Sequence, residues 1–485
     1  MRFAWDLSKA VLWPAAQREK GKGWNVSKLQ HDVSVRAVKA VNPILITLPF
    51  AGAWFAYYAS RLASPFYYWG NWVVVGLFFL LYITFCRVYD GFLFSTMRIS
   101  ELVYSQTLAA VISNGVLFVV ICLLSKRFGN LLPLVLVIAL QVVLAAIWSF
   151  AAHQWYFARF PASRSAVVYD AREGLERLVQ EYGLEKKFQI CAAMSVQQAL
   201  ANKEVLDNME TVFLSGIHSH DRNILLKYCV EHDITVYVIP RIGDVLMSGA
   251  HAMHLFHLPM LRVGRYHPSP IYLLLKRGFD ILACGLATVI LSPVFLVTAA
   301  AIKAHDHGPV FYKQKRLTKD GKVFEVLKFR SMRVDAEKDG VARLSTGDND
   351  DRITPVGRFI RKVRIDELPQ LLNILKGDMT ICGPRPERPE IAEQYEQELP
   401  EFRLRLQAKA GLTGYAQVYG KYNTTPYDKL MMDLMYISHP SFWQDLQIMF
   451  ATVKILFMKE STEGFAQDTV QEGAVGKKAD EGKIA

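Results

Sequence analysis

The sequence predicts a membrane protein of mixed α and α/β fold, and three observations lead to that prediction. Hydrophobic residues make up 52% of the 485 residues, which exceeds the level usual in soluble proteins. Much of the excess lies in four long uncharged segments near the N-terminus. Further along, short β-like runs alternate with helical patterns, and a fifth apolar segment precedes a stretch rich in charge and proline. We therefore expect a four-helix transmembrane region, a small α/β module, and a mostly helical domain with a β-hairpin.

The four uncharged segments each reach about 20 residues, the length that spans a bilayer core. Because none contains Asp, Glu, Lys or Arg, a transporter with an intramembrane site is disfavoured. The first segment begins only at residue 40, so we expect no cleavable signal peptide. Together they form the predicted transmembrane region 40–158, with segments at 40–60, 62–86, 102–125 and 128–158.

The flanking charges predict the orientation. Residues 1–39 carry eight Lys and Arg residues, whereas Arg61 is the one cation of the first loop, so this N-terminal segment is expected in the cytoplasm. Four spans return the chain to the cytoplasm at Arg159, although Lys126 and Arg127 in the second outer loop oppose this orientation. The net charge of +11 suits anionic lipid and anionic substrates, and nucleic acid is a poorer partner because the cations accompany membrane segments.

Residues 164–265 predict a small cytosolic βαβ module with a parallel, Rossmann-like sheet. Four β-like runs alternate with helical stretches such as "GLERLVQEY" and "DRNILLKYCVEH". The first run leads into "YDAREG", which lacks the glycines that bring backbone close to a pyrophosphate. We therefore expect a structural or regulatory module rather than a dinucleotide site. The runs are "SAVVYD", "FQICAA", "TVFLSG" and "ITVYVIP".

The fifth apolar run predicts a helix over 279–303 that enters the membrane and returns to the same face. Ser292-Pro293 lies near its middle, where proline breaks the helix and the serine hydroxyl can satisfy a freed backbone group. Lys276, Arg277 and Lys303 flank both ends, as expected for two ends in one headgroup layer. A plain spanning helix is the alternative, but it would place everything after Lys303 outside, away from cytoplasmic substrates.

Two segments after this run concentrate cations. "GPVFYKQKRLTKDGKVFEVLKFRSMR" predicts a hairpin turning at Asp320-Gly321, and we expect most of its cations to face lipid headgroups. "GPRPERPE" places Arg385 and Arg388 among rigid prolines, which suits bidentate phosphate contacts. The hairpin cations are Lys313, Lys315, Arg316, Lys328 and Arg330.

Asp366 and Glu367 in "VRIDELPQLLN" form an acid pair at a predicted helix start, with Asp366 as the N-cap. Pro369 at the third helical position lacks an N–H, so half of the usual capping gain is absent. Free N–H groups and Arg364 would attract a phosphate there. A carboxylate in this place would have a lowered pKa and serve as a nucleophile or a ligand of Mg²⁺.

These motifs, in this order with "KAGLTGYAQVYG", resemble the bacterial sugar transferase family, the monotopic phosphoglycosyl transferases, over about 270–460. The four spans plus the α/β module resemble its long form. The resemblance implies a re-entrant helix, an Asp366-Glu367 dyad and dependence on Mg²⁺. It also implies that Asp366 attacks the β-phosphate of a UDP-sugar, expels UMP and passes the sugar phosphate to undecaprenyl phosphate. This is the first membrane step of capsule, exopolysaccharide or O-antigen synthesis, on the cytoplasmic face of the bacterial inner membrane.

The resemblance has one local departure. "RKVRID" places Arg364 and Ile365 where the family often has a small hydroxyl residue. The candidate phosphate contacts are Arg364, Arg385 and Arg388.

Two alternatives remain open. Asp348-Asn349-Asp350 forms a D-x-D pattern, which would suit a metal-dependent glycosyltransferase that releases UDP instead of UMP. A non-catalytic scaffold of polysaccharide assembly is the second.

Six cysteines without C-x-x-C spacing predict neither disulfides nor zinc, and the polar tail 461–485 is expected to be disordered. The sequence leaves open the sugar and the oligomeric state, a homodimer included.

Overall fold

The computed structural model describes residues 23–170, 175, 179, 183–334, 352–420 and 425–456, which belong to two compact units, Met1–Tyr156 and Phe157–Ala485. Three predictions concern other residues. The disordered tail 461–485, the D-x-D pattern at 348–350 and the helix expected over "GLERLVQEY" all lie outside the described residues, apart from two positions in that helix.

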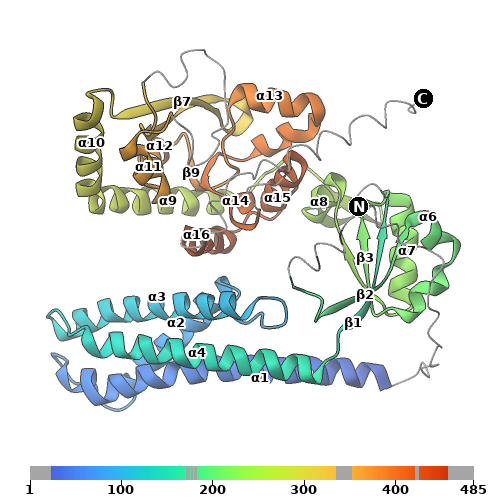
Figure 1. Ribbon diagram of the computed structural model, residues 1–485, viewed down its shortest axis with the longest axis horizontal. Coiled ribbons are helices and arrows are strands. Elements are labelled where there is room, and N and C mark those ends of the chain that lie inside the picture. The colour runs from blue at the N-terminus through green and yellow to red at the C-terminus, as the bar shows by residue number, and fades with distance from the viewer. Residues whose placement is uncertain are drawn as a thin grey trace, which may run out of the picture. The chain divides into compact units, whose positions relative to one another are not determined.

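The first unit contains the four predicted apolar helices, coloured blue to teal in Figure 1. Each is long and apolar enough to cross a membrane, which confirms the four predicted membrane helices. The first begins well before residue 40 and continues beyond Ala53 through a π-helical turn at Trp54–Tyr58 and a 3-10 turn at Ala59–Arg61. The helices are α1 Gly23–Ala53, α2 Gly70–Val88, α3 Ile99–Ser125 and α4 Leu132–Arg159.

Uncharged polar side chains connect the four helices from inside. The Asn42 amide of α1 donates to Gln106 of α3 at 3.1 Å and accepts from the Tyr82 hydroxyl of α2 at 2.8 Å. Asn114 of α3 donates to Gln141 of α4 at 2.7 Å. All five side chains are buried. Hydrogen bonds of this kind fix the register of helices in an apolar medium.

The second unit starts with a parallel sheet, as the alternating pattern predicts. Its strand order is β2-β1-β3-β4, and each adjacent pair runs parallel. Ala166, Val168, Val212 and Leu214 are fully buried, and they pack with Leu225 and Cys229 of α7. The elements are β1 Ser163–Tyr169, β2 Phe188–Ser195, α6 Val196–Ala201, η3 Lys203–Asn208, β3 Thr211–Ser215, α7 Ser219–Glu231, β4 Thr235–Val238, α8 Ile242–Ser248, β5 His251–Leu255 and β6 Leu258–Arg262.

Helix α8 connects the sheet region to the rest of this unit. Val245 is buried in a core with Phe402, Leu430 and Leu434, which lie beyond residue 400. The Ser438 hydroxyl donates to the carbonyl of Val245 at 3.0 Å. The segment predicted as a separate module therefore shares a hydrophobic core with the following domain.

The fifth apolar run forms two helices, α9 Pro270–Ile290 and α10 Ser292–Asp306, bent by 60° (Figure 1). The break falls at the predicted residues. Pro293 stands in the first turn of α10, and the Ser292 hydroxyl donates to the carbonyl of Val289 at 2.7 Å. Such a bent pair is either a broken span or a re-entrant loop.

The prediction that Lys276 and Arg277 face headgroups is wrong. Lys276 Nζ donates to the carbonyl of Cys382 at 2.9 Å and pairs with Asp445 at 2.8 Å. Arg277 donates to the carbonyls of Ile374 and Leu375 at 2.6 and 2.8 Å. Both cations therefore anchor α9 to the protein instead of marking a membrane surface.

The remaining elements follow α10 in the chain. The hairpin prediction is confirmed: β7 and β8 are antiparallel, with Asp320 and Gly321 at positive φ in the turn. The elements are β7 Phe311–Leu317, η4 Lys319–Gly321, β8 Val323–Phe329, α11 Pro355–Lys362, η5 Ile365–Glu367, α12 Gln370–Lys376, β9 Thr380–Cys382, α13 Pro389–Glu398, η6 Pro400–Gln407, β10 Gly411–Thr413, α14 Tyr415–Tyr419, α15 Pro426–Ser438 and α16 Phe442–Leu456.

Candidate active site

The acid pair lies in a 3-10 turn, not at the N-cap of an α-helix as the sequence suggests. Arg364 enters the turn in the left-handed region at φ 58°, and α12 begins only at Gln370, with Pro369 before it. The N–H groups of Glu367 and Leu368 donate within the turn at 3.4 and 3.1 Å. These two N–H groups are therefore not free for a phosphate.

Asp366 is a buried carboxylate, 8% exposed. Among the residues that the structure describes, no hydrogen bond or ion pair engages its side chain. Burial raises its pKa, and the charge of Glu367 raises it further, while Lys328, Arg361 and Arg364 oppose the rise. The lowered pKa expected for Asp366 is therefore wrong, because its burial and its acidic neighbour outweigh the cations.

Glu367 is held by two cations. Its Oε1 lies 3.0 Å from Lys328 Nζ of β8 and 3.4 Å from Arg385 Nη2. Burial would raise the pKa of Glu367, but the charges of Lys328, Arg385 and Arg364 outweigh it and hold that pKa well below its usual range. The two adjacent acids thus have opposite environments, with one carboxylate fixed and ionised and the other buried without a described partner.

Helix α12 is anchored at its middle and at its C-terminal end, which holds the acidic turn that precedes it. The amide of Asn373 donates to the carbonyl of Glu325 at 2.7 Å and accepts from the N–H of Leu327 at 2.9 Å, so α12 is bound to β8. Arg277 of α9 occupies the last carbonyls of α12, and Lys409 donates to the carbonyl of Gly377 at 2.8 Å. Cations at a helix C-terminus are favourable because they oppose its partial negative charge.

The expectation that most hairpin cations face lipid is wrong for three of five. Lys313 and Lys315 are exposed, whereas Arg316, Lys328 and Arg330 point into the protein. Sequence reasoning missed Lys328 as a site residue, although a signal was present. Lys328 is two and four residues from the buried Val326 and Phe324, so the two-residue period of a strand places it on the inward face.

The loop "GPRPERPE" brings one of its arginines to the acid pair. Arg385 reaches Glu367, while Arg388 stands at the N-cap of α13, and no contact between Arg388 and either acid is recorded in the described part of the chain. Arg364 lies near enough to lower the pKa of both acids. Of the three predicted phosphate contacts, Arg364 and Arg385 therefore lie at the acid pair.

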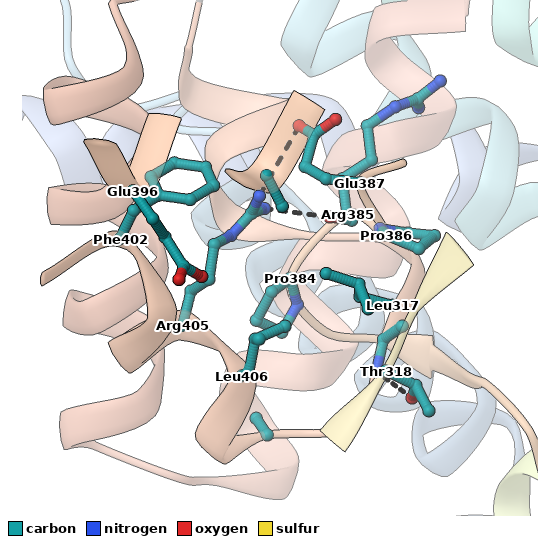
Figure 2. A pocket seen from close by; sticks show the side chains of 13 residues that line it. Leu317, Thr318, Pro384, Arg385, Pro386, Glu387, Glu396, Phe402, Arg405 and Leu406 are labelled. Atoms are coloured by element: carbon teal, nitrogen blue, oxygen red, sulfur yellow. Dashed lines mark hydrogen bonds and ion pairs between the residues drawn. The ribbon is translucent and has the colours of Figure 1, made fainter. Parts of the chain in front are cut away.

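A small pocket opens beside this loop (Figure 2). Its walls combine apolar side chains such as Leu317, Phe402 and Leu406 with the charged Glu387 and Arg405. Asp366 and Glu367 do not line it, and Arg385 is common to the pocket and the acid pair. The pocket thus borders the candidate site without containing the acids.

Metal ligands are sparse near the site. The described residues contain no group of three or more His, Cys, Asp or Glu side chains that suits a metal ion. Mg²⁺ needs fewer protein ligands, because it keeps several waters and takes substrate phosphate oxygens. The unengaged carboxylate of Asp366, beside Glu367, fits that mode of binding.

Residues 271–459 match the family model described as bacterial sugar transferase. The chain is 40% identical over 234 residues to a UDP-N-acetylgalactosamine-undecaprenyl-phosphate N-acetylgalactosaminephosphotransferase of Aeromonas hydrophila, covering 48% of this chain and 54% of that protein. It is 40% identical over 206 residues to a UDP-glucose:undecaprenyl-phosphate glucose-1-phosphate transferase of Caulobacter vibrioides, covering 41% and 76%.

A protein of the same description in Escherichia coli is 41% identical over 212 residues, covering 43% of this chain and 44% of that protein. The match thus spans about half the length of the Aeromonas and Escherichia relatives and about three quarters of the Caulobacter one. The names of these relatives specify different sugars, so the similarity assigns no sugar to this chain.

Proposed function

The chain belongs to the bacterial sugar transferase family, and from that premise we propose that it transfers a sugar 1-phosphate from a UDP-sugar to undecaprenyl phosphate and releases UMP. The proposed setting is the cytoplasmic face of the bacterial inner membrane, as the first membrane step of capsule, exopolysaccharide or O-antigen synthesis. The acceptor and the reaction type follow the names of relatives that are 40–41% identical to the chain over the 206–234 residues that align.

The observation that carries this proposal is the contrast between the two acids. A nucleophilic carboxylate must have an oxygen that is not committed to another partner. Asp366 has no described partner, whereas Lys328 and Arg385 fix Glu367. We therefore assign nucleophilic attack to Asp366, and to Glu367 the role of a fixed charge that orients the reacting groups.

The proposed reaction has two displacements at the β-phosphorus of the donor. An oxygen of Asp366 forms a bond to this phosphorus, and the bond to the bridging oxygen breaks, so UMP leaves with that electron pair. A phosphate oxygen of undecaprenyl phosphate then attacks the same phosphorus and displaces the Asp366 carboxylate. Since the intermediate is covalent, the water-soluble donor and the lipid acceptor need not bind together.

Arg385 and Arg364 are the proposed phosphate contacts. Arg385 is 44% exposed and retains guanidinium donors beyond its 3.4 Å contact with Glu367. Arg388, at the start of α13, remains a candidate for contact with a part of the UDP-sugar that lies farther from the acid pair. Mg²⁺, held by Asp366 and Glu367 with substrate oxygens, would neutralise the diphosphate charge. Glu367 is already balanced by two cations, so Asp366 is the more available ligand.

The domain organisation of the chain is also part of the proposal. We propose that α9 and α10 form a re-entrant pair over about 279–303, because their 60° bend falls at Ser292-Pro293. Residues 270–460 would be the catalytic domain, and 164–265 a cytosolic Rossmann-like module after the transmembrane region 40–158 and the N-terminal segment 1–39. The parallel order β2-β1-β3-β4 supports that description of the module.

A panel of UDP-sugars with undecaprenyl phosphate tests the function, with UMP and UDP measured separately. We expect UMP from one of the donors, and Asp366→Asn and Asp366→Ala should both abolish it. The alanine variant is included because asparagine can deamidate. Glu390→Gln, an exposed acid in the first turn of α13, is the matched control and should retain full activity. UDP as the product would indicate a glycosyltransferase, and full transfer by Asp366→Ala would exclude the nucleophile assignment.

A reporter fused after residue 460 tests the re-entrant helix. With four spans and a re-entrant pair the reporter lies in the cytoplasm, and with a fifth crossing it lies outside. Labelling of the reporter by a membrane-impermeant reagent in intact cells would therefore contradict the proposed topology.

A further inference from the structure

We propose that Arg405 is a positioning residue for the transfer reaction: by holding the backbone carbonyl of Arg385, it determines where the Arg385 side chain lies against Glu367. This inference rests on the proposed function and names a residue outside the acid pair that governs donor binding. It is carried by the hydrogen bonds of the loop that presents Arg385.

Every carbonyl from Pro384 to Glu387 has a hydrogen-bond donor from a different part of the chain. The N–H of Gly411 donates to Pro384 at 2.9 Å, and the N–H of Leu317 donates to Glu387 at 3.0 Å. The carbonyls of Arg385 and Pro386 accept from two arginine side chains, Arg405 at 2.9 Å and Arg316 at 3.0 Å. The loop is thus fixed at consecutive backbone positions, and its prolines restrict φ further.

Close backbone packing supports the same loop from the β10 side. A Cβ at Gly383 would collide with the carbonyl of Lys409, and one at Gly411 would collide with the N–H of Gly383. Glycine is needed at both positions because the chain that leaves β9 at Gly383 packs directly against the backbone at the start of β10. The loop therefore has little freedom to shift as a body.

Arg405 is the buried centre of this arrangement. Its side chain is 4% exposed, and Figure 2 shows its guanidinium directed at Glu387 and the backbone of Arg385. It pairs with Asp433, 1% exposed, at 2.7 Å and with Glu387 at 3.5 Å. Since Arg316 lies on the other side of Glu387, two cations balance two acids, so the cluster is neutral as a whole. Buried charges are retained in proteins when they are paired and hydrogen-bonded in this way.

The side chain of Arg385 depends on this support. It is 44% exposed and meets Glu367 at 3.4 Å, and an ion pair with one exposed partner at that distance contributes little. That is too little to order a long side chain by itself. Its position must therefore come from the backbone, and Arg405 is the side chain that holds the carbonyl of the same residue.

A double-mutant cycle on Arg405→Lys and Arg385→Ala tests the proposal, with kcat and KM for the UDP-sugar measured by UMP release. Lysine keeps the charge beside Asp433, but one ammonium cannot reproduce the planar fork that serves Asp433, Glu387 and the carbonyl together. Arg403→Lys is the matched control, because Arg403 lies on the same element η6 and is exposed. Circular dichroism and thermal denaturation monitor folding of every variant.

We expect Arg405→Lys alone to raise the KM for the donor about 10- to 20-fold, at the lower end of the range that the loss of one charge-assisted hydrogen bond produces. In the Arg385→Ala background the same change should alter kcat/KM by less than about twofold, because the side chain that it positions is gone. Arg403→Lys should change neither constant. Equal losses in both backgrounds would indicate a purely structural role and would overturn the proposal, as would an unchanged KM in the single variant.

Failure of the proposed function is a separate result. If the wild-type protein releases no UMP from any donor, the function is wrong, and amide hydrogen exchange then decides the positioning claim without turnover. Arg405→Lys should accelerate exchange in peptides that span residues 383–388, whereas Arg403→Lys should not. Unchanged exchange in that segment would refute the positioning of the loop by Arg405.

Discussion

Lys328→Met should destabilise the protein far more than Lys313→Met, although both changes remove one lysine from the same hairpin. Lys328 lies 3.0 Å from Glu367, and the two side chains are 21% and 18% exposed. Lys313 lies 3.3 Å from Glu325, with 62% and 55% exposed. The residue type and the distance are nearly matched, so burial is the main difference between the pairs.

The magnitude follows from the position of Glu367. A unit charge pair at this separation has a Coulomb energy of about 5 kcal/mol at an effective dielectric constant near 20. Ordering of both side chains and desolvation remove part of it, so the expected loss lies between the roughly 0–1 kcal/mol of exposed pairs and the roughly 3–5 kcal/mol of fully buried ones. We expect about 2 kcal/mol for Lys328→Met and under about 0.5 kcal/mol for Lys313→Met.

Thermal denaturation of the purified proteins in detergent measures the difference, with the same detergent and pH for each variant. A loss of about 2 kcal/mol corresponds to a fall in Tm of about 3 °C for a unit of this length, and Lys313→Met should stay within about 1 °C of the wild type. UMP release should also fall for Lys328→Met alone. Equal shifts for both variants, or none for Lys328→Met, would show that burial does not strengthen the Glu367 pair.

Three further predictions concern the support and titration of the site. Asn373→Ala should lower the free energy of unfolding by about 2–4 kcal/mol, because the change leaves two backbone groups of β8 without partners. Chemical denaturation measures this loss, and a value below about 1 kcal/mol would contradict the anchoring of α12. Arg330 lowers the pKa of Asp306 to about 2 by hydrogen bonding, so this stabilisation is present above pH ~4 and lost as pH falls toward ~2. Asp306→Asn should therefore cost about 1–2 kcal/mol at neutral pH, with a smaller difference from the wild type below pH ~4, and a constant difference would refute the linkage. Burial raises the pKa of Asp366, and the charge of Lys328 opposes that rise. Lys328→Met should therefore move the acidic limb of the pH profile of kcat/KM for UMP release to higher pH. A shift to lower pH would contradict the proposed role of Asp366 as the nucleophile.

The sequence predicted those parts of the fold that depend on local pattern. Long uncharged runs gave the four apolar helices, because length and composition alone decide whether a helix suits a bilayer. Asp320-Gly321 gave the hairpin turn, since that pair favours positive φ. Ser292-Pro293 gave the break between α9 and α10, because proline cannot continue a helix.

The predictions that failed concern side chains whose partners lie far away in the sequence. Lys276 and Arg277 look like headgroup ligands until β9 and α12, about 100 residues away, supply carbonyls for them. Nothing local reveals that Arg405 holds the Arg385 carbonyl or that Lys328 meets Glu367. A cluster of charges in a sequence therefore shows that a site is present, but its internal pairing emerges only from the fold.

The contact between Arg277 and the end of α12 has a mechanical consequence. Because α12 directly follows the acidic turn, the two hydrogen bonds from Arg277 tie the turn to the apolar helix α9. In the proposed re-entrant arrangement, a change in the depth of α9 in the bilayer would therefore move Asp366 with it. The proposed lipid acceptor would then be selected by how far its phosphate projects from the bilayer, and membrane thickness would affect turnover without any change in the sequence.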